Sequence, residues 1–460
     1  MALASLQLVA GPLADRFGRR RATVGGLALL ALGGIGAAAA PSIGVLIAAR
    51  AVQGVGGAFV LTGALGLVAV QFPDGDRLKV LALRSAIIAT AFAIGPLAGG
   101  VLTDLLGWRS VFAFDAALAV PLLLVLARGQ EELGPGRAAR LDPPGLVALA
   151  VTMLAVVFVV IRGNAQGWTS GPIVVALAVT VVGAVTVAVR QRAGHHLVPV
   201  ELLRDRSLAA SVLALMALYV TVFGGFIYVT IFLRTVGGLG PAATGGLLVS
   251  FAVASLAAVL VVTRSPHRDR LDRLVPGSLL LAALGLVAVA LAAPSREPVT
   301  LIPGLVLVGL ASGIVNPILT ASQIAAFKPS DGGIAAGLNG ASRQFGTALG
   351  TAVLGAVVLQ AIGRRLVAVG DLAPAVRDRI AAGDLDAGLA AVAAPLRPIA
   401  EEAYRAGLVH GLQVATLGGA AVLLGAAALT ARWLGRERAA RDAGERAVRS
   451  TGRDLPAHGG

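Results

Sequence analysis

The stretch that decides the fold is Val275–Ala293, which reads VPGSLLLAALGLVAVALAA. It lacks the polar stripe that a helix on the surface of a soluble domain carries. An α-helix rises 1.5 Å per residue, so about 20 apolar residues cross the ~30 Å hydrocarbon layer of a bilayer. The stretch is therefore predicted to span a membrane, and a chain built of such stretches is an all-α polytopic membrane protein.

The same pattern recurs along the chain. Apolar residues make up 57% of the 460 residues and charged residues 13%, about half the charged share of a soluble domain. The segment Met1–Ala10 is apolar but too short to cross a bilayer alone, and it has no charged start or cleavage site of a signal peptide. After it we predict full spans at 23–40, 44–71, 80–103, 108–127, 143–162, 171–190, 208–233, 242–263, 275–293, 299–326, 333–362 and 406–434.

Basic residues lie mostly between these spans. With the loop Arg16–Arg21 placed in the cytoplasm, the cytoplasmic loops and tail hold 26 of the 38 Lys and Arg residues, and the opposite side holds ten. Such an excess marks the cytoplasmic side, so we predict a multi-pass protein of the cell membrane with a cytoplasmic C-terminus. The net charge of +14 then reflects topology, and we expect no nucleic-acid partner.

Cysteine is absent, which excludes disulfides and thiolate metal sites. We expect no metal site and no cofactor. The partners we expect are a small-molecule substrate, protons and the lipid bilayer, with the chain acting as a monomer.

The predicted spans fall into four parts. Residues 1–127 form a first helix bundle, and 128–204 contain a Gly/Pro-rich link and two further helices. Residues 205–434 form a second bundle of six helices, in which the long loop 363–405 predicts one or two short surface helices. The charged tail 435–460 lacks apolar runs and is expected to be disordered.

The sharpest motif is Gly11-x-x-x-Asp15-Arg16-x-Gly18-Arg19-Arg20. The first glycine permits close helix approach, and the aspartate can bond arginines or face a helix N-terminus across the loop. We interpret the cluster as a conformational latch, and the alternative is an ordinary basic loop. Asp269–Arg273 echoes it weakly at the matching place in the second bundle, as a parallel repeat requires.

Arg50, followed by Gln53 and Gly54, lies inside its predicted span. Charges within a membrane are rare, costly and usually functional. The alternative is a structural arginine bound by backbone carbonyls.

The stretch Gly95-Pro96-Leu-Ala-Gly99-Gly100 lies deep in another span. Its proline removes a backbone hydrogen bond, and its glycines let a neighbouring helix touch the backbone. We expect a bendable, closely packed helix there, and a merely structural kink is the alternative.

In this order and on these spans, the three motifs resemble the signature sequences of the major facilitator superfamily. Four further features resemble its fourteen-helix drug:proton antiporter branch, of the multidrug efflux type. They are the two extra central helices, the stretches Gly163–Trp168 and Arg343–Gly346, and the loop 363–405. The resemblance implies a major facilitator fold with two helix bundles plus two extra central helices, and export of drug-like compounds without enzymatic chemistry. Two features depart from the family: its acid-bearing first helix has no counterpart, and Ala91 replaces a usual glycine.

The energy source must be an ion gradient or the gradient of the substrate. A phosphate-binding loop needs Lys followed by Ser or Thr, whereas Val80 and Pro329 follow the two lysines, Lys79 and Lys328. Proton coupling needs an acid near the membrane midplane, and Asp115 is the candidate.

We expect Arg50 and Asp115 to share the charge network that couples transport to protons, and a water-facing Asp115 near the helix end is the alternative. Arg343 would suit an anionic or polar substrate and Asp115 a cationic one, and the sequence leaves both open. The candidate substrate-binding residues are polar groups on bundle helices: Gln53, Asn316, Gln323, Asn339, Arg343 and Gln344.

Three other functions stay open. The chain is alternatively an uncoupled or differently coupled exporter of an endogenous metabolite, or an inactive truncated transporter in which Arg50 lacks a partner. A membrane-embedded enzyme would need a cluster of catalytic side chains, whereas His195 and His196 have only Glu201 near them in the sequence.

Overall fold

The computed structural model describes residues 2–71, 74–128, 142–193, 205–264, 271–327, 332–370, 372–381 and 385–451. All regular secondary structure in these ranges is helical. The all-α prediction is thereby confirmed. His195, His196 and Glu201, and the echo at Asp269–Arg270, lie outside the described residues.

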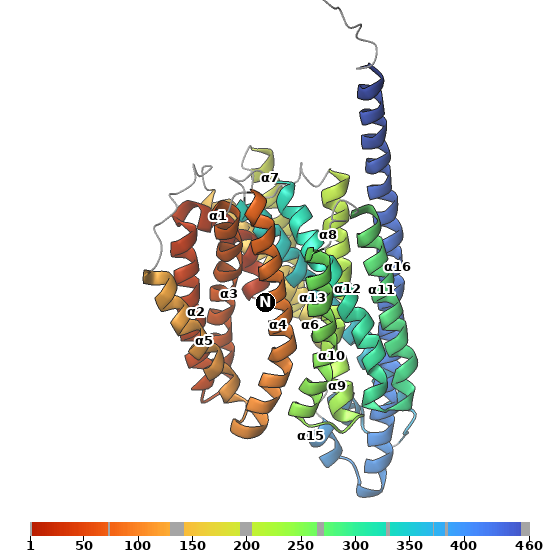
Figure 1. Cartoon of the computed structure of the whole chain (residues 1–460). Coiled ribbons are helices and arrows are strands. Elements are labelled where there is room, and N and C mark those ends of the chain that lie inside the picture. Colours follow the sequence, from red (N-terminus) through yellow and green to blue (C-terminus); the bar gives the residue numbers. More distant parts are fainter. Residues whose placement is uncertain are drawn as a thin grey trace, which may run out of the picture.

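The helices form two bundles that stand side by side (Figure 1). In the first bundle, α2 packs between α3 and α5, and α1 packs on α3. Gly26 of α2 and Gly56 of α3 allow this contact, because a Cβ atom on either would lie within 2.8 Å of the other's carbonyl oxygen. The bundle comprises α1 (Ala2–Phe17), α2 (Arg19–Ala38), α3 (Ile43–Gln71), α4 (Asp74–Leu106) and α5 (Arg109–Arg128).

Two further helices, α6 (Pro143–Gln166) and α7 (Gly171–Arg192), lie between the bundles in the sequence. They pack on each other, and α6 also contacts α1 and α13. An ion pair fixes the start of α6 to the end of α7, where Arg190 Nε donates to Asp142 Oδ2 at 2.8 Å. The flanking parts of the predicted link, 129–141 and 194–204, lie outside the described residues.

The second bundle has the larger buried core, which includes Leu215, Phe232 and Leu279. Its first span is interrupted by a short π-helix, η2 (Tyr219–Phe223). Its α11 packs on α12 and α16, and α13 packs on α16. The long helices are α8 (Arg206–Leu218), α9 (Gly224–Thr235), α10 (Pro241–Arg264), α11 (Leu271–Ala292), α12 (Ile302–Ala325), α13 (Gly332–Val367) and α16 (Arg397–Thr451).

Two short helices, α14 (Pro374–Ala381) and α15 (Leu385–Ala390), lie in the loop between α13 and α16. The prediction of one or two short helices in this loop is confirmed. They sit at the end of the second bundle opposite the projecting end of α16 (Figure 1).

Eleven helices of the described chain are long and apolar enough to cross a membrane, and each coincides with one of the predicted spans. The remaining prediction, 80–103, lies on α4, of which Ile94–Leu106 is a shorter apolar helix by the same measure. Apolar side chains face outward on these helices, as on α7, where Val175 is 63% exposed and Val182 66%. Such surfaces suit contact with lipid tails.

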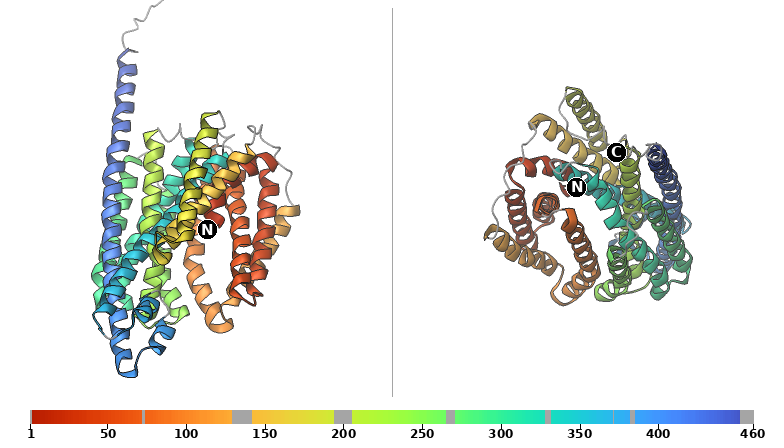
Figure 2. Two further views of the ribbon diagram at one scale, coloured as in Figure 1. Left: turned by 180° about the vertical axis from the view of Figure 1, so that it is seen from behind. Right: turned by 45° about the horizontal axis from the view of Figure 1, so that its top comes forward.

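The tail from residue 435 is predicted to be disordered, and the structure differs from this prediction. α16 continues as a helix to Thr451 and projects beyond the bundle (Figures 1 and 2). Residues 435–451 are rich in Ala and Arg, which have high helix propensity, so the helix extends without an apolar run. Residues 452–460 lie outside the described residues.

Two helix pairs make the most extensive contacts between the two bundles. α4 of the first bundle packs on α10 of the second, and α1 packs on α13. In Figure 2, the view from the top shows α4 standing next to the second bundle. The space beside this contact is where the polar and aromatic residues described next gather.

Candidate functional site

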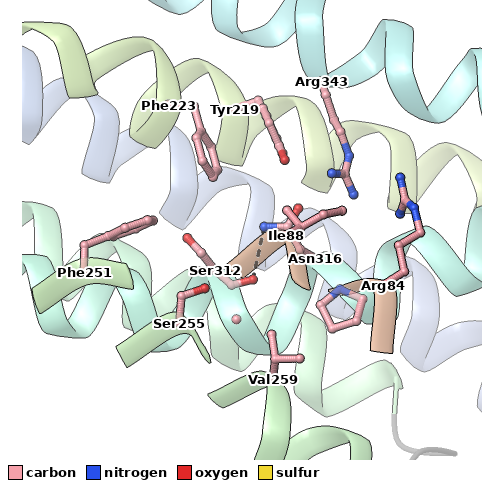
Figure 3. Close-up of a pocket in the computed structure, with 12 residues that line it drawn as sticks. Arg84, Ile88, Tyr219, Phe223, Phe251, Ser255, Val259, Ser312, Asn316 and Arg343 are labelled. Atoms are coloured by element: carbon pink, nitrogen blue, oxygen red, sulfur yellow. Dashed lines mark hydrogen bonds between the residues drawn. The ribbon is translucent and has the colours of Figure 1, made fainter. Parts of the chain in front are cut away.

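A small cavity lies where α4 meets the second bundle. Figure 3 shows the side chains that surround it. They come from α4, α8 to η2, α10, α12 and α13, and they are Arg84, Ile88, Tyr219, Phe223, Phe251, Ser255, Val259, Ser312, Gly313, Asn316, Pro317 and Arg343.

Aromatic rings form one side of the cavity. Tyr219 and Phe223, at the two ends of the π-helix η2, stack with their ring centroids 4.3 Å apart. Phe251 of α10 meets Phe223 edge to face at 6.2 Å. A π-helical turn changes the direction of the side chains in a helix, and such turns are frequent at functional sites. Here the turn presents two rings to one cavity.

Arginines form the other side. Arg343 of α13 donates from Nη2 to Thr320 Oγ1 at 2.7 Å, and its guanidinium carbon lies 5.4 Å from the Tyr219 ring centroid. Arg84 of α4 reaches the same region, and the two guanidinium groups lie side by side in Figure 3. Among the described residues that line this cavity there is no Asp or Glu.

Several polar atoms around the cavity are buried without a hydrogen-bond partner in the described structure. They are Ser312 Oγ, Asn316 Oδ1 and Arg343 Nε. A buried polar group left unpaired costs about 1–3 kcal/mol. These atoms are therefore suited to bind water or a polar ligand.

The predicted substrate-binding residues separate into two groups. Asn316 and Arg343 line the cavity. Gln323 and Asn339 are 0% and 3% exposed and bond to each other, with Asn339 Nδ2 donating to Gln323 Oε1 at 2.8 Å. Gln344 is partly buried on α13 and is not among the lining residues.

Gln53 lies elsewhere, in the contact between α2 and α3. It is buried, and a Cβ atom on Gly33 would lie 2.6 Å from its Cγ. Two of the six residues that the sequence predicts to bind substrate therefore line the cavity.

Arg84 is the cavity residue that sequence reasoning missed. It was counted with the basic residues of a cytoplasmic loop, although it lies inside the predicted span 80–103. Its position inside a span could have identified Arg84 as a candidate site residue, because a charged residue within a membrane span is usually functional. The aromatic residues carried no such signal, since aromatic side chains in an apolar helix are common.

Arg50 and Asp115 lie near each other but do not form an ion pair in the described structure. Arg50 Nη1 donates to Gln53 Oε1 at 2.6 Å, and its guanidinium carbon lies 5.4 Å from the Phe112 ring centroid. Asp115 is partly buried on α5, where Arg50 acts on it electrostatically. The arrangement brings the predicted pair within electrostatic range, away from the residues that line the cavity.

The Gly11–Arg20 cluster links α1, α2 and the end of α5. Asp15 Oδ1 accepts from Arg19 Nε at 2.6 Å, and Gly18 separates α1 from α2 at a φ of 100° that favours glycine. Arg20 donates to the carbonyl oxygens of Leu126 and Ala127, at 3.1 and 2.7 Å.

The remaining members of the cluster differ in burial. Gly11 is buried and Arg16 is exposed. A cation at the last carbonyls of a helix is favourable, so Arg20 ties the α1–α2 loop to α5.

The Gly95–Gly100 stretch lies at the contact between α4 and α10. A Cβ atom on Gly100 would lie 2.4 Å from the Pro241 oxygen, and one on Gly245 would lie 2.3 Å from the Pro96 oxygen. The contact is thus reciprocal, with a glycine of each helix against a proline carbonyl of the other. We call these four residues the Pro–Gly seam.

Added Cβ atoms on Gly95 and Gly99 would meet nothing within 4 Å, so close packing concerns Gly100 alone. Next to the seam, Asp104 Oδ2 accepts from the Ala242 N–H at 2.9 Å.

Comparison with known proteins decides the family. Residues 1–351 match the model of the Major Facilitator Superfamily. The chain belongs to the major facilitator superfamily. The sequence-based resemblance to the superfamily and the expected major facilitator fold are thereby confirmed, while the fourteen-helix branch and the missing first helix stay predictions.

Relatives within this superfamily carry names that refer to drug resistance. Multidrug resistance protein Stp of Mycobacterium tuberculosis is 31% identical over 363 residues, which cover 78% of this chain and 67% of the relative. Multidrug efflux pump LfrA of Mycolicibacterium smegmatis is 28% identical over 365 residues, covering 78% and 71%.

A solved structure supports the fold. The human organic anion transporter MFSD10 (TETRAN) matches with a TM-score of 0.59 over 93% of this chain and 82% of its own, at 17% sequence identity. At this identity the likeness concerns the fold alone. The described residues of this major facilitator protein contain no group of three His, Cys, Asp or Glu side chains that could hold a metal ion.

Proposed function

We propose that this major facilitator protein is a secondary active exporter, which moves small amphipathic, drug-like compounds across the cell membrane in exchange for protons. The observation that carries the proposal is the cavity between α4 and the second bundle, with aromatic rings on one side and unpaired polar atoms on the other. An amphipathic compound needs both surfaces. The names of the relatives Stp and LfrA, a multidrug resistance protein and a multidrug efflux pump, support the same class of substrate.

In this proposal the two bundles move against each other about the cavity. Asn316 and Arg343 contact the substrate from the second bundle, and Arg84 contacts it from the first. The Pro–Gly seam between α4 and α10 closes one end of the path, and the Gly11–Arg20 cluster acts as the latch on the cytoplasmic side. The chain is placed as a monomer in the cell membrane with its C-terminus in the cytoplasm.

The coupling residues in this proposal are Arg50 and Asp115. A carboxyl group within a bundle can take up a proton from one side and release it to the other, and a nearby guanidinium stabilises the charged form. One charge that crosses 100 mV supplies about 2.3 kcal/mol. That sustains a substrate gradient of roughly fifty-fold, at about 1.4 kcal/mol for each tenfold.

The test is transport by the full chain in reconstituted vesicles, with a panel of cationic and anionic dyes and antibiotics. An imposed pH gradient should drive export by the wild type, and Asp115→Asn should abolish that drive because the amide does not titrate. Glu297→Gln, an exposed change outside the bundles' interior, is the matched control and should transport normally. Unchanged pH-driven export by Asp115→Asn would contradict its role.

The uncoupled exporter gives a different result in the same vesicles. Export that survives collapse of the proton gradient by a protonophore would favour it over antiport. A panel in which no compound moves faster than in empty vesicles would contradict export itself.

A further inference from the structure

We infer that the cavity takes an organic anion with a flat, apolar body. The inference rests on the proposed function and specifies the chemical class of the substrate. It starts from the charge of the cavity, to which Arg84 and Arg343 each bring a guanidinium group and no lining residue brings a carboxylate. The two guanidinium groups are close enough to act on each other electrostatically.

Two like charges in a partly buried cavity repel each other, and the low dielectric strengthens this repulsion. A cationic compound would add a third positive charge to the same cavity. A carboxylate, sulfonate or phosphate group between the arginines would instead reverse the sign of both interactions. Arginine's planar fork of N–H donors also matches such oxyanions well.

The hydrogen bonds of Arg343 orient its guanidinium group. Its Nη2 is held by Thr320, which fixes the direction of the guanidinium, while its Nε is buried without a partner in the described structure. A bound oxyanion is the ligand that an unpaired N–H of a cation prefers. Thr320 thus orients the Arg343 guanidinium, whose Nε still lacks an acceptor.

The rest of the cavity selects the body of the anion. Phe223 and Phe251 lie at the end of the cavity away from the two arginines (Figure 3). Rings that meet edge to face, as these do, provide an apolar surface for a flat molecule. A molecule with an acidic group at one end and an aromatic body at the other would contact both.

The carboxylate that would favour a cationic substrate lies outside this cavity. Asp115 is on α5 beside Arg50 and is not among the lining residues. The alternative of a cationic substrate, which the sequence left open, has no carboxylate to bind it in this cavity.

The anion would also join the two bundles. Arg84 lies on α4 of the first bundle and Arg343 on α13 of the second. Without an anion their repulsion opposes approach of the bundles at this point. A ligand that pairs with both arginines binds more tightly to the conformation in which they are close, and therefore shifts the protein toward it.

Two xanthene dyes of similar shape and opposite charge test the inference. Fluorescein is an anion at pH 7.4, and rhodamine 123 is a cation. Binding of each dye to the purified full chain is measured by fluorescence polarisation. We expect the wild type to bind fluorescein at least tenfold more tightly than rhodamine 123.

Arg84→Gln and Arg343→Gln should each weaken fluorescein binding by on the order of tenfold to a hundredfold, because each removes a charged hydrogen bond. Arg343→Lys, which keeps the charge, should retain part of the affinity. Arg109→Gln removes an arginine that bonds to the Ala40 carbonyl at the other end of the bundle, and it should leave fluorescein binding unchanged. Elution volume and melting temperature verify that each variant is folded.

Equal or stronger binding of rhodamine 123 by the wild type would overturn the inference, as would unchanged fluorescein binding in both glutamine variants. Absence of fluorescein binding by the folded wild type would overturn it as well. Export of cationic compounds in the vesicle assay, combined with any of these results, would leave the proposed export standing while the anion inference falls.

Discussion

Arg20 shows how a single basic residue at the start of a helix can hold two helices together. It donates to the carbonyl oxygens of Leu126 and Ala127 in the last turn of α5. Arg20→Ala removes both bonds and a favourable charge at a helix C-terminus, so we expect a loss of about 1 kcal/mol in the free energy of unfolding. Arg16→Ala is the matched control, because Arg16 is exposed and surface changes usually stay within about 0.5 kcal/mol. Thermal unfolding in detergent, followed by circular dichroism, measures both; equal melting temperatures for the two variants would contradict the role of Arg20.

Residues of similar chemistry differ in role because of the direction in which their side chains point. Asn316 and Asn339 are both asparagines on helices of the second bundle, yet only Asn316 lines the cavity, while Asn339 bonds to Gln323 in the interior. Sequence patterns identify both as polar groups within apolar spans. When apolar residues cover all faces of a helix, its sequence does not indicate how the helix is rotated about its axis. Sequence patterns therefore could not separate residues that line the cavity from residues that form structural hydrogen bonds.

At the scale of helices, the Pro–Gly seam makes a sharp prediction. Gly100→Ala would place a Cβ atom 2.4 Å from the Pro241 oxygen, and forcing a side chain into a filled contact costs about 1–3 kcal/mol. We expect α4 and α10 to separate there and export to fall at least tenfold. Gly99→Ala is the matched control, because the added atom would meet nothing within 4 Å and alanine favours a helix over glycine. Export rates of the two variants in vesicles decide the matter, and a similar loss in both would show that close packing is not the cause.

The helices themselves were predictable because membrane spans are set by length and apolar content, which are local properties. The exceptions are η2 and the end of α16. A π-helical turn depends on how Tyr219 and Phe223 pack against α10 and α13, which the sequence of one span does not specify. Residues 435–451 lack an apolar run, which predicted disorder, while the helix propensity of their Ala and Arg residues was the stronger signal.

At the scale of the whole molecule, the absence of cysteine makes the movement of the bundles testable by cross-linking. Asp104 and Ala242 face each other across the contact between α4 and α10, since the Asp104 carboxylate accepts from the Ala242 N–H at 2.9 Å. In the double variant Asp104→Cys, Ala242→Cys, we expect an oxidant to form a disulfide that fixes this end of the path closed. If export requires the bundles to separate here, the oxidised protein should be inactive and a reducing agent should restore its export rate. Each single variant controls for the loss of the Asp104 bond and should be insensitive to oxidant. Full export by the cross-linked protein would show that the contact between α4 and α10 stays closed throughout the cycle, and the alternating movement of two bundles about the cavity would then have to be abandoned.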